Sequence, residues 1–311
     1  MNLTLAYHPT NSGIHRLNPF VMLAWLGATV GSTLVVQHPI WLVAVFLTTV
    51  PVAYAARVVE QWTALMKLML WMGVAIVCIN LLVSQQGTHV FLEAGFRLPL
   101  LGVPRMTGEA ALFGFGMALR LGSIISAFTI LNLSVHPDDL LRAAVKLRLP
   151  YRSVLVTSLS TRFIPVLLAD ARTISDVQQS RGLAFDRGTI VQRIRSRGAL
   201  IFPLLSNSLD RAVQVAEAME ARAYGASTRR TFYRDTPMVS ADVVMVLVLC
   251  GALLLAVVAR GFGFGSFEYY PTLGNLGMTP VMWGTLALLC GMLLSVLVPN
   301  VLRRRNSNDS V

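Results

Sequence analysis

Long uncharged apolar stretches occupy both ends of the chain and predict helices that cross a membrane. The first runs from Leu17 to Ala56, 40 residues without a Lys, Arg, Asp or Glu. One helix needs only about 20 residues to cross the hydrocarbon core of a bilayer. The tripeptide Gln37–Pro39 lies in the middle, and proline suits a turn or the first helical position. The stretch therefore predicts a hairpin of two spans, at 20–36 and 40–56.

Further apolar stretches complete the predicted membrane part, with four more spans expected at 66–86, 108–131, 243–259 and 280–299. The fourth of the six spans contains Arg120, and a charge inside a span is costly unless it is paired or near water. Arg120 is therefore a candidate functional residue. A structural role is the favoured alternative, in which Arg120 bonds a helix end or pairs with a carboxylate such as Glu109.

The segment between the fourth and fifth spans, residues 133–240, is basic and shows helical periodicity. It carries 16 of the 26 Lys and Arg residues of the chain. One helix is predicted to begin near Pro137. A second, at 153–181, places apolar residues at spacings of three and four, namely Phe163, Leu167, Ala171, Ile174 and Val177. A third, at 204–222, has one apolar face, made of Leu209, Val213, Ala216 and Met219.

Proline and glycine residues are expected to kink or end these helices. Pro165 should kink the second helix. Gly182 and Gly225 follow the second and third helices, and glycine tolerates the left-handed conformation found just past a helix end. Each of these two helices therefore delivers an arginine, Arg181 or Arg222, in its final turn.

The composition is that of a membrane protein. Of the 311 residues 55% are apolar and only 13% are charged, whereas soluble domains carry about 25% charged residues. The net charge of +11 does not point to nucleic acid, because the basic residues border apolar spans. Cys78, Cys250 and Cys290 fall in separate apolar runs without metal-ligand spacing, so no metal site is predicted.

The distribution of basic residues predicts the orientation of the chain. Six spans place both termini on one side, and that side carries the segment 133–240 together with Arg16, Arg57, Lys67 and Arg303–Arg305. Because cytoplasmic loops are enriched in Lys and Arg, this side is expected to be the cytoplasm. Three regions follow: 1–132 with four spans, a cytoplasmic helical region at 133–240, and 241–311 with two spans and a basic tail.

Two short motifs around arginine are the leading candidate binding residues. Ser180-Arg181-Gly182 and Ala221-Arg222-Ala223 share a small-Arg-small form, 41 residues apart. Each arginine could simply complement a helix dipole, worth about 0.3–1 kcal/mol. The repetition favours docking instead, because small neighbours let a partner's backbone approach and a guanidinium presents five fixed donors to it.

Several segments resemble the transmembrane T component of energy-coupling factor (ECF) transporters, the relatives of the cobalt-transport permease. Ser12–Pro19, Ser-Gly-Ile-His-Arg-Leu-Asn-Pro, resembles the segment that leads into that family's first span. Arg162–Pro165 followed by Gln179–Gly182 resembles its first coupling helix, and Ala218–Gly225 resembles the second. The family's Ala-Arg-Gly is here Ser-Arg-Gly and Ala-Arg-Ala, and Asn18 replaces an aspartate.

The resemblance implies an all-α polytopic membrane protein of about six spans, with the coupling helices inserted between spans 4 and 5. It implies a non-catalytic subunit that couples two cytoplasmic ATPases to one separate membrane subunit that captures a vitamin, vitamin precursor or metal ion. ATP and Mg would be bound by the ATPases. The implied docking residues are Ser180, Arg181, Gly182, Ala221, Arg222 and Ala223. The implied supporting residues are Arg162, Pro165, Glu220 and Gly225. The implied location is the cell (inner) membrane of a bacterium or archaeon, with cytoplasmic termini.

Other classes of membrane protein fit the sequence less well. An ion-coupled secondary transporter with a cytoplasmic regulatory domain is the alternative, but it should show ionisable residues or broken helices in several spans. An intramembrane enzyme would need a nucleophile and base, or metal ligands, in the spans. The sequence also lacks the Gly-x-x-x-x-Gly-Lys-Ser/Thr phosphate loop of an ATPase. No residues that bind the substrate are predicted.

Overall fold

The computed structural model describes residues 12–84, 90–93, 105–137, 139–140, 143, 150–182, 190–225, 238–270, 274 and 277–298. The chain divides into two compact units. The membrane unit comprises residues 1–140 and 236–311, and the helical-pair unit comprises residues 141–235. The predicted helix near Pro137 and the basic residues Arg303–Arg305 lie largely outside the described residues.

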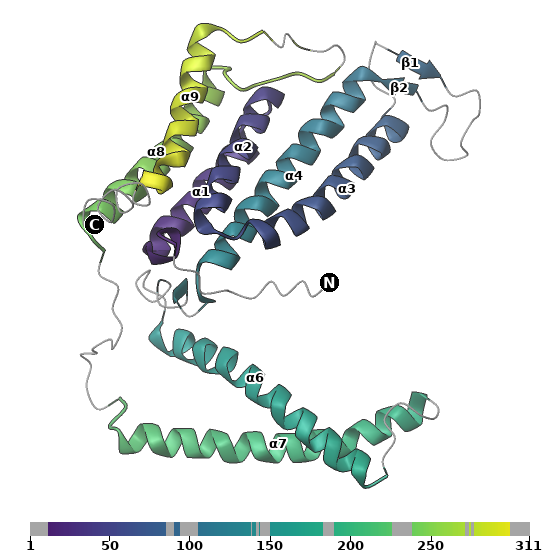
Figure 1. Cartoon of the computed structure of the whole chain (residues 1–311), viewed down its shortest axis with the longest axis vertical. Coiled ribbons are helices and arrows are strands. Elements are labelled where there is room, and N and C mark those ends of the chain that lie inside the picture. The colour runs from purple at the N-terminus through teal and green to yellow at the C-terminus, as the bar shows by residue number, and fades with distance from the viewer. Residues whose placement is uncertain are drawn as a thin grey trace, which may run out of the picture. The chain divides into compact units, whose positions relative to one another are not determined.

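Six long α-helices of the described residues build the membrane unit (Figure 1): α1 (Pro19–Val35), α2 (Pro39–Ala56), α3 (Val59–Val83), α4 (Gly108–Ser134), α8 (Ser240–Gly261) and α9 (Pro280–Leu294). Short 3-10 turns at Ile14–Arg16 and Ser295–Leu297 flank them. The strands β1 (Val90–Glu93) and β2 (Arg105–Thr107) form an antiparallel hairpin between α3 and α4. The predicted all-α polytopic class is confirmed, with this hairpin as an addition.

Sequence signals set the beginnings of several helices. Pro19 and Pro39 stand at the first positions of α1 and α2, and the Asn18 side chain accepts a hydrogen bond from the Phe20 amide at 3.1 Å. Asn18 therefore caps α1 although it replaces the aspartate of the resembled family. Helix α3 begins at Val59, seven residues before the predicted span. Its first turns hold charged residues, which a membrane helix tolerates near its end because long side chains reach the interface.

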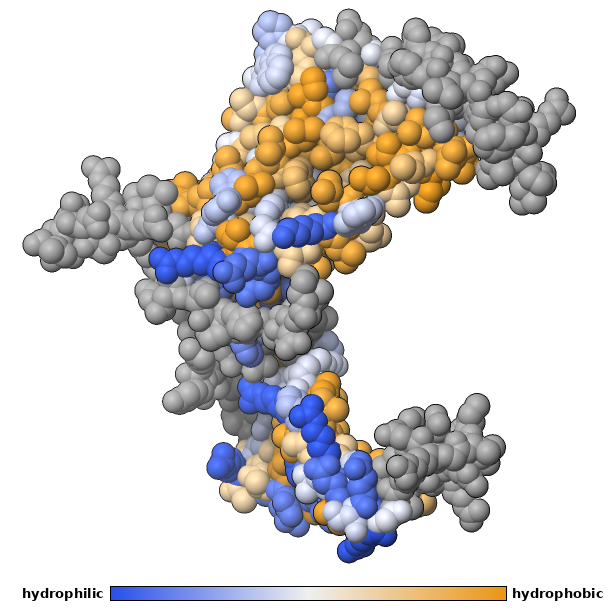
Figure 2. Space-filling model, turned by 45° about the vertical axis from the view of Figure 1, so that its right-hand side comes forward, coloured by the Kyte–Doolittle hydropathy of each residue, from blue (hydrophilic) through white to orange (hydrophobic). Residues whose placement is uncertain are grey.

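Six helices of the described chain are long and apolar enough to cross a membrane, but one of them differs from the prediction. One of the six consists of residues 153–180 of α6, which belongs to the helical-pair unit. Helix α1, which was predicted to be a span, is not among the six because it has only 17 residues. Helix α1 nevertheless packs on α4 and α8 and buries Trp25 completely, and 17 residues is the lower limit for a span. Figure 2 shows hydrophobic residues spread over the surface of the membrane unit, as lipid contact requires.

A chain of buried hydrogen bonds joins three helices of the membrane unit. The Trp62 indole N–H of α3 donates to the Ser126 hydroxyl of α4 at 2.8 Å. Ser126 donates to Thr49 of α2 at 2.8 Å, and Thr49 donates to the Phe46 carbonyl at 2.7 Å. Each N–H or O–H donor in this series of hydrogen bonds has an acceptor. A buried polar network stabilises the fold only when its donors are satisfied in this way.

Replacing Ser126 with alanine is expected to lower the free energy of unfolding by about 1–3 kcal/mol, because the buried indole N–H of Trp62 would lose its acceptor. Thermal unfolding in detergent measures the change. Ser123→Ala is the matched control, since the Ser123 hydroxyl bonds only the Leu119 carbonyl of its own helix. If both variants lowered the free energy of unfolding equally, the hydrogen bonds that join the helices through Ser126 would have no stabilising role.

Arg120 bonds a helix end, which is the first of its two predicted structural roles. Its Nε donates to the Thr33 carbonyl at 3.2 Å and its Nη2 donates to the Val36 carbonyl at 2.9 Å. Carbonyls at the end of a helix lack partners within the helix. The guanidinium from α4 therefore caps the C-terminal end of α1.

The segment after α8 holds the turn between α1 and α2. The Gly265 carbonyl accepts the amides of Gln37 and His38 at 2.8 and 2.9 Å, and the Tyr269 hydroxyl donates to the Gln37 carbonyl at 2.6 Å. His38 is buried against the Phe267 ring, and burial lowers the pKa of its imidazole. Burial also raises the pKa of Tyr269, opposed by the charge of Arg120. Both pKa shifts favour the neutral form of the side chain.

Candidate functional site

Two long helices, α6 (Tyr151–Ser180) and α7 (Ile190–Ala221), build the helical-pair unit (Figure 1). They pack on each other. Helix α7 begins 14 residues earlier than the predicted start at 204. Pro203 lies inside α7, because a proline removes one hydrogen bond of a long helix and the helix can continue past it.

An ion pair lies where the two helices meet. The Arg211 Nη2 of α7 is 2.9 Å from the Asp170 Oδ2 of α6, and both side chains are partly buried, at 33% and 25% exposure. Arg181 lies 11 residues beyond Asp170, and Arg222 lies 11 residues beyond Arg211. At 1.5 Å per residue, each arginine is about 16 Å along its helix from the ion pair.

The same offset relates several other positions of the two helices. Asp170 and Arg211 are 41 residues apart, as are Arg181 and Arg222. Partly buried positions follow this offset in four further pairs: Phe163 with Leu204, Leu167 with Ser208, Ile174 with Val215, and Gln178 with Met219. The two helices therefore share a pattern of partly buried positions, and each carries its arginine at the equivalent place near its end.

The first arginine motif forms the end of α6. Arg181 is the C-cap residue, and its amide donates to the carbonyls of Val177 and Gln178, both at 3.2 Å. Gly182 follows with φ of +89°, and its amide bonds the Gln179 carbonyl at 2.9 Å. Glycine adopts this left-handed conformation without strain. The predicted helix stop at Gly182 is confirmed.

The second arginine motif ends α7 in the same way. The Arg222 amide donates to the Ala218 carbonyl at 3.3 Å, and Ala223 follows with φ of +56°. Alanine therefore adopts the left-handed conformation that the resembled family assigns to glycine, at a cost of about 1–2 kcal/mol. Gly225 also has positive φ, at +94°. Alanine at position 223 therefore keeps the left-handed backbone geometry and adds backbone strain that a glycine would not have.

The side chains of both motifs are exposed, from Ser180 to Gly182 and from Ala221 to Ala223. Among the described residues, no carboxylate oxygen lies within 4.0 Å of either guanidinium, and the Arg211–Asp170 pair is the salt bridge that this part of the chain shows. Arg181 and Arg222 are thus accessible to a partner. Exposure at a helix end is equally compatible with dipole complementation, so both interpretations stay open.

The predicted supporting residues do not gather at one place. Glu220 and Gly225 lie beside Arg222 at the end of α7 and are exposed. Arg162 and Pro165 are also exposed but lie 19 and 16 residues before Arg181, about 28 and 24 Å along α6. They can therefore support the first motif only through the helix itself.

The predicted apolar face of α7 is not the face that packs on α6. Leu209, Val213 and Ala216 are exposed, and only Met219 of the predicted set is partly buried. The packed face contains Ser208 and Arg211, polar residues that a search for apolar periodicity passes over. Both helices consequently expose large apolar side chains, which include Val156, Ile164 and Leu168 on α6 and Ile201, Phe202, Leu205, Leu209 and Val213 on α7.

Comparison with known proteins points to one family. Residues 10–233 match the cobalt transport protein family, CbiQ. A Bacillus selenitireducens protein named energy-coupling factor transporter transmembrane protein EcfT is 29% identical over 262 residues, covering 80% of this chain and 94% of its own length. The EcfT protein of Heliobacterium modesticaldum is 29% identical over 266 residues, with 80% and 94% coverage. A Bifidobacterium longum protein named as an ABC transporter ATP-binding protein is 28% identical over 264 residues, 81% of this chain and 32% of its own.

Proposed function

Since the chain belongs to the cobalt transport protein family, we propose that it couples two cytoplasmic ATPases to a separate membrane subunit that captures the substrate. Its EcfT relatives make it a transmembrane component of an energy-coupling factor transporter. The chain itself would perform no catalysis, and ATP and Mg would be bound by the partner ATPases.

The observation that carries the proposal is the matched pair of helix ends. Arg181 and Arg222 are exposed, each precedes a residue with positive φ, and each lies 11 residues from the ion pair between the helices. Two equivalent binding ends suit two equivalent partners, because related surfaces on a pair of ATPases would meet the same backbone and guanidinium geometry twice. If each arginine only complemented the dipole of its own helix, the two arginines would not need to occupy equivalent positions.

The relative from Bifidobacterium longum supports association with ATPases. This chain aligns with about a third of that protein, whose name is that of an ABC transporter ATP-binding protein. In such a protein, a segment similar to this chain and an ATP-binding part would belong to one polypeptide and therefore to one assembly. The same association between separate chains is the simplest arrangement for this protein.

The exposed apolar side chains of the helical-pair unit supply a surface for the third partner. Phe163, Leu167 and Met219, from the apolar faces predicted for the two helices, are only partly exposed. Ile164, Leu168, Leu205 and Leu209 are each more than half exposed and occupy equivalent positions on the two helices. We assign the contact with the membrane substrate subunit to this second set. Closure of the ATPases would shift the helix ends, and the apolar surface would transmit that shift to the substrate subunit.

Co-purification tests the proposal most directly. The tagged protein, extracted from its native bacterial or archaeal membrane in mild detergent, is expected to bring down two ATPase copies and one small membrane protein, identified by mass. Which vitamin, precursor or metal ion is carried would follow from that third subunit. Recovery of the protein without any ATPase, from cells that express one, would contradict the proposal.

The expected orientation places the helical-pair unit and both termini in the cytoplasm. In a variant whose native cysteines are replaced, a cysteine at Glu217, exposed on α7, should react with an impermeant reagent only after the cells are permeabilised. A cysteine at Glu268, exposed in the segment after α8, should react in intact cells. Labelling of position 217 in intact cells would overturn the orientation and the ATPase docking with it.

A further inference from the structure

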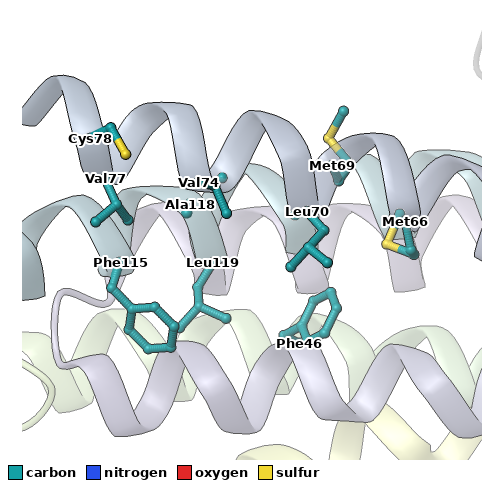
Figure 3. A pocket seen from close by; sticks show the side chains of 12 residues that line it. Phe46, Met66, Met69, Leu70, Val74, Val77, Cys78, Phe115, Ala118 and Leu119 are labelled. Atoms are coloured by element: carbon teal, nitrogen blue, oxygen red, sulfur yellow. The ribbon is translucent and has the colours of Figure 1, made fainter.

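An apolar groove of about 390 Å³ runs along α4 between α2 and α3. Phe46 of α2 stands on one side, residues from Met66 to Cys78 of α3 stand on the other, and Phe115 and Leu119 of α4 lie between them (Figure 3). Helix α4 packs closely on both neighbours, whereas α2 and α3 touch each other little. The groove exists because α2 and α3 diverge over α4.

Small residues keep the groove open. Gly73 packs against Ala118, whose Cβ would lie 3.3 Å from a Cβ added at position 73. Gly122 leaves room that a Cβ would enter without strain, since its nearest atoms would be ring carbons of Phe46 at 3.7 and 3.9 Å. A larger residue at 122 would therefore fill the groove without displacing the backbone.

The chemistry of the groove excludes a polar occupant. The twelve residues that line it are aliphatic, aromatic or sulfur-containing side chains and glycines, without a hydroxyl, amide or charged group. Their backbone amides and carbonyls are engaged in helices. A ligand with polar groups at this depth would have no partner for them and would lose about 1–3 kcal/mol or more for each.

The dimensions of the groove fit one extended hydrocarbon chain. Met66 and Cys78 are 12 residues apart on α3, which is about 18 Å of helix. The volume of about 390 Å³ divided by that length leaves a cross-section of about 22 Å². The groove is thus long and narrow, as the binding of one extended hydrocarbon chain requires.

The groove is continuous with the lipid-facing surface of a polytopic membrane protein. Its mouth is bordered by Leu70, Val74 and Phe115, which are 70%, 51% and 46% exposed. All three belong to helices that are long and apolar enough to cross a membrane. The surrounding bilayer therefore supplies the occupant. We propose that this groove binds one acyl chain of a membrane lipid, wedged between α2 and α3 along α4.

Photolabelling of the full-length protein tests this assignment. The protein is placed in vesicles of phosphatidylethanolamine and phosphatidylglycerol that contain a trace of phospholipid with a diazirine in one acyl chain. After irradiation, the modified peptides are identified by mass spectrometry. Peptides with Met69 or Cys78 should carry several-fold more adduct than peptides with Leu254 of α8 or Leu288 of α9, which are exposed and do not line this groove.

Two variants fill the groove from different helices, Gly122→Leu from α4 and Val74→Phe from α3. Each should reduce labelling of Met69 and Cys78 several-fold and leave that of Leu254 unchanged. Gly27→Leu is the matched control, because Gly27 is exposed on α1 with no atom within 4 Å of an added Cβ.

Three results would overturn the assignment. The first is groove labelling no higher than that of Leu254, which would mean ordinary contact with surrounding lipid. The second is unchanged groove labelling in both filling variants while each retains its helical content. The third is loss of groove labelling when the protein is purified with its membrane partners, which would assign the surface to a protein contact.

Discussion

Cells that carry the double replacement Arg181→Ala and Arg222→Ala are expected to lose ATP-driven uptake, while the protein still inserts into the membrane. Losing a buried, charge-assisted contact at an interface costs about 2–5 kcal/mol, and each 1.4 kcal/mol weakens binding tenfold. Because both guanidinium groups are exposed and lie outside the packed face of their helices, their loss should not unfold the helical pair. The double variant should release the ATPases from detergent-solubilised complexes.

Lysine replacements separate geometry from charge at the same positions. Lysine keeps the positive charge but lacks the planar fork of donors. Arg181→Lys with Arg222→Lys is therefore expected to behave more like the alanine variant than like the unaltered protein. Arg172→Ala is the control for the general loss of a basic residue, since Arg172 is also exposed on α6 but lies nine residues before the motif.

Dipole complementation makes a different prediction for these variants. If the arginines act only on the helix ends, each alanine costs about 0.3–1 kcal/mol of local stability. ATPase co-purification and uptake would then stay near normal, and lysine would substitute fully for arginine. That pattern would remove the docking role from both motifs and leave the coupling function without its proposed contact residues.

Reversing one charge of the ion pair, in Arg211→Asp, is expected to abolish uptake through a different step. The new carboxylate would lie opposite Asp170, and like charges at a partly buried contact cost several kcal/mol. Both arginine motifs remain intact in this variant, so the ATPases should still co-purify. The two helix ends would no longer hold their relative positions, and ATP hydrolysis should continue without transport.

The exchanged pair, Asp170→Arg with Arg211→Asp, provides the rescue. It restores an attractive pair at the same place and should recover most of the uptake that the single variant loses. Asp210→Arg controls for charge alone, since Asp210 is exposed and lies next to Arg211 in the sequence. Transport that survives Arg211→Asp, or an exchange that rescues nothing, would show that the ion pair does not hold the two helices in their working arrangement.

The membrane helices were largely predictable because their cause is local. A span requires a run of about 20 apolar residues, and such a run is visible without any tertiary contact. The predicted span at 40–56 differs from α2 by one residue at its start, where Pro39 begins the helix. The helix stop at Gly182 was equally visible, since the need for positive φ falls on a single residue. Helix α7 instead ends at Ala221, and the first residue with positive φ after it is Ala223 rather than the predicted stop Gly225.

The sequence by itself thus determined the membrane class, the two amphipathic helices and the arginine at each helix end, because hydropathy and helix termination act within a few residues. Only the tertiary structure decided which face of α7 packs, since Arg211 contacts Asp170 of α6 while Leu209 and Val213 of the predicted apolar face are exposed. It also decided that Ala223 adopts the left-handed conformation of a glycine. The groove along α4 exists only in the folded chain, because its walls come from three helices whose spacing no single segment encodes.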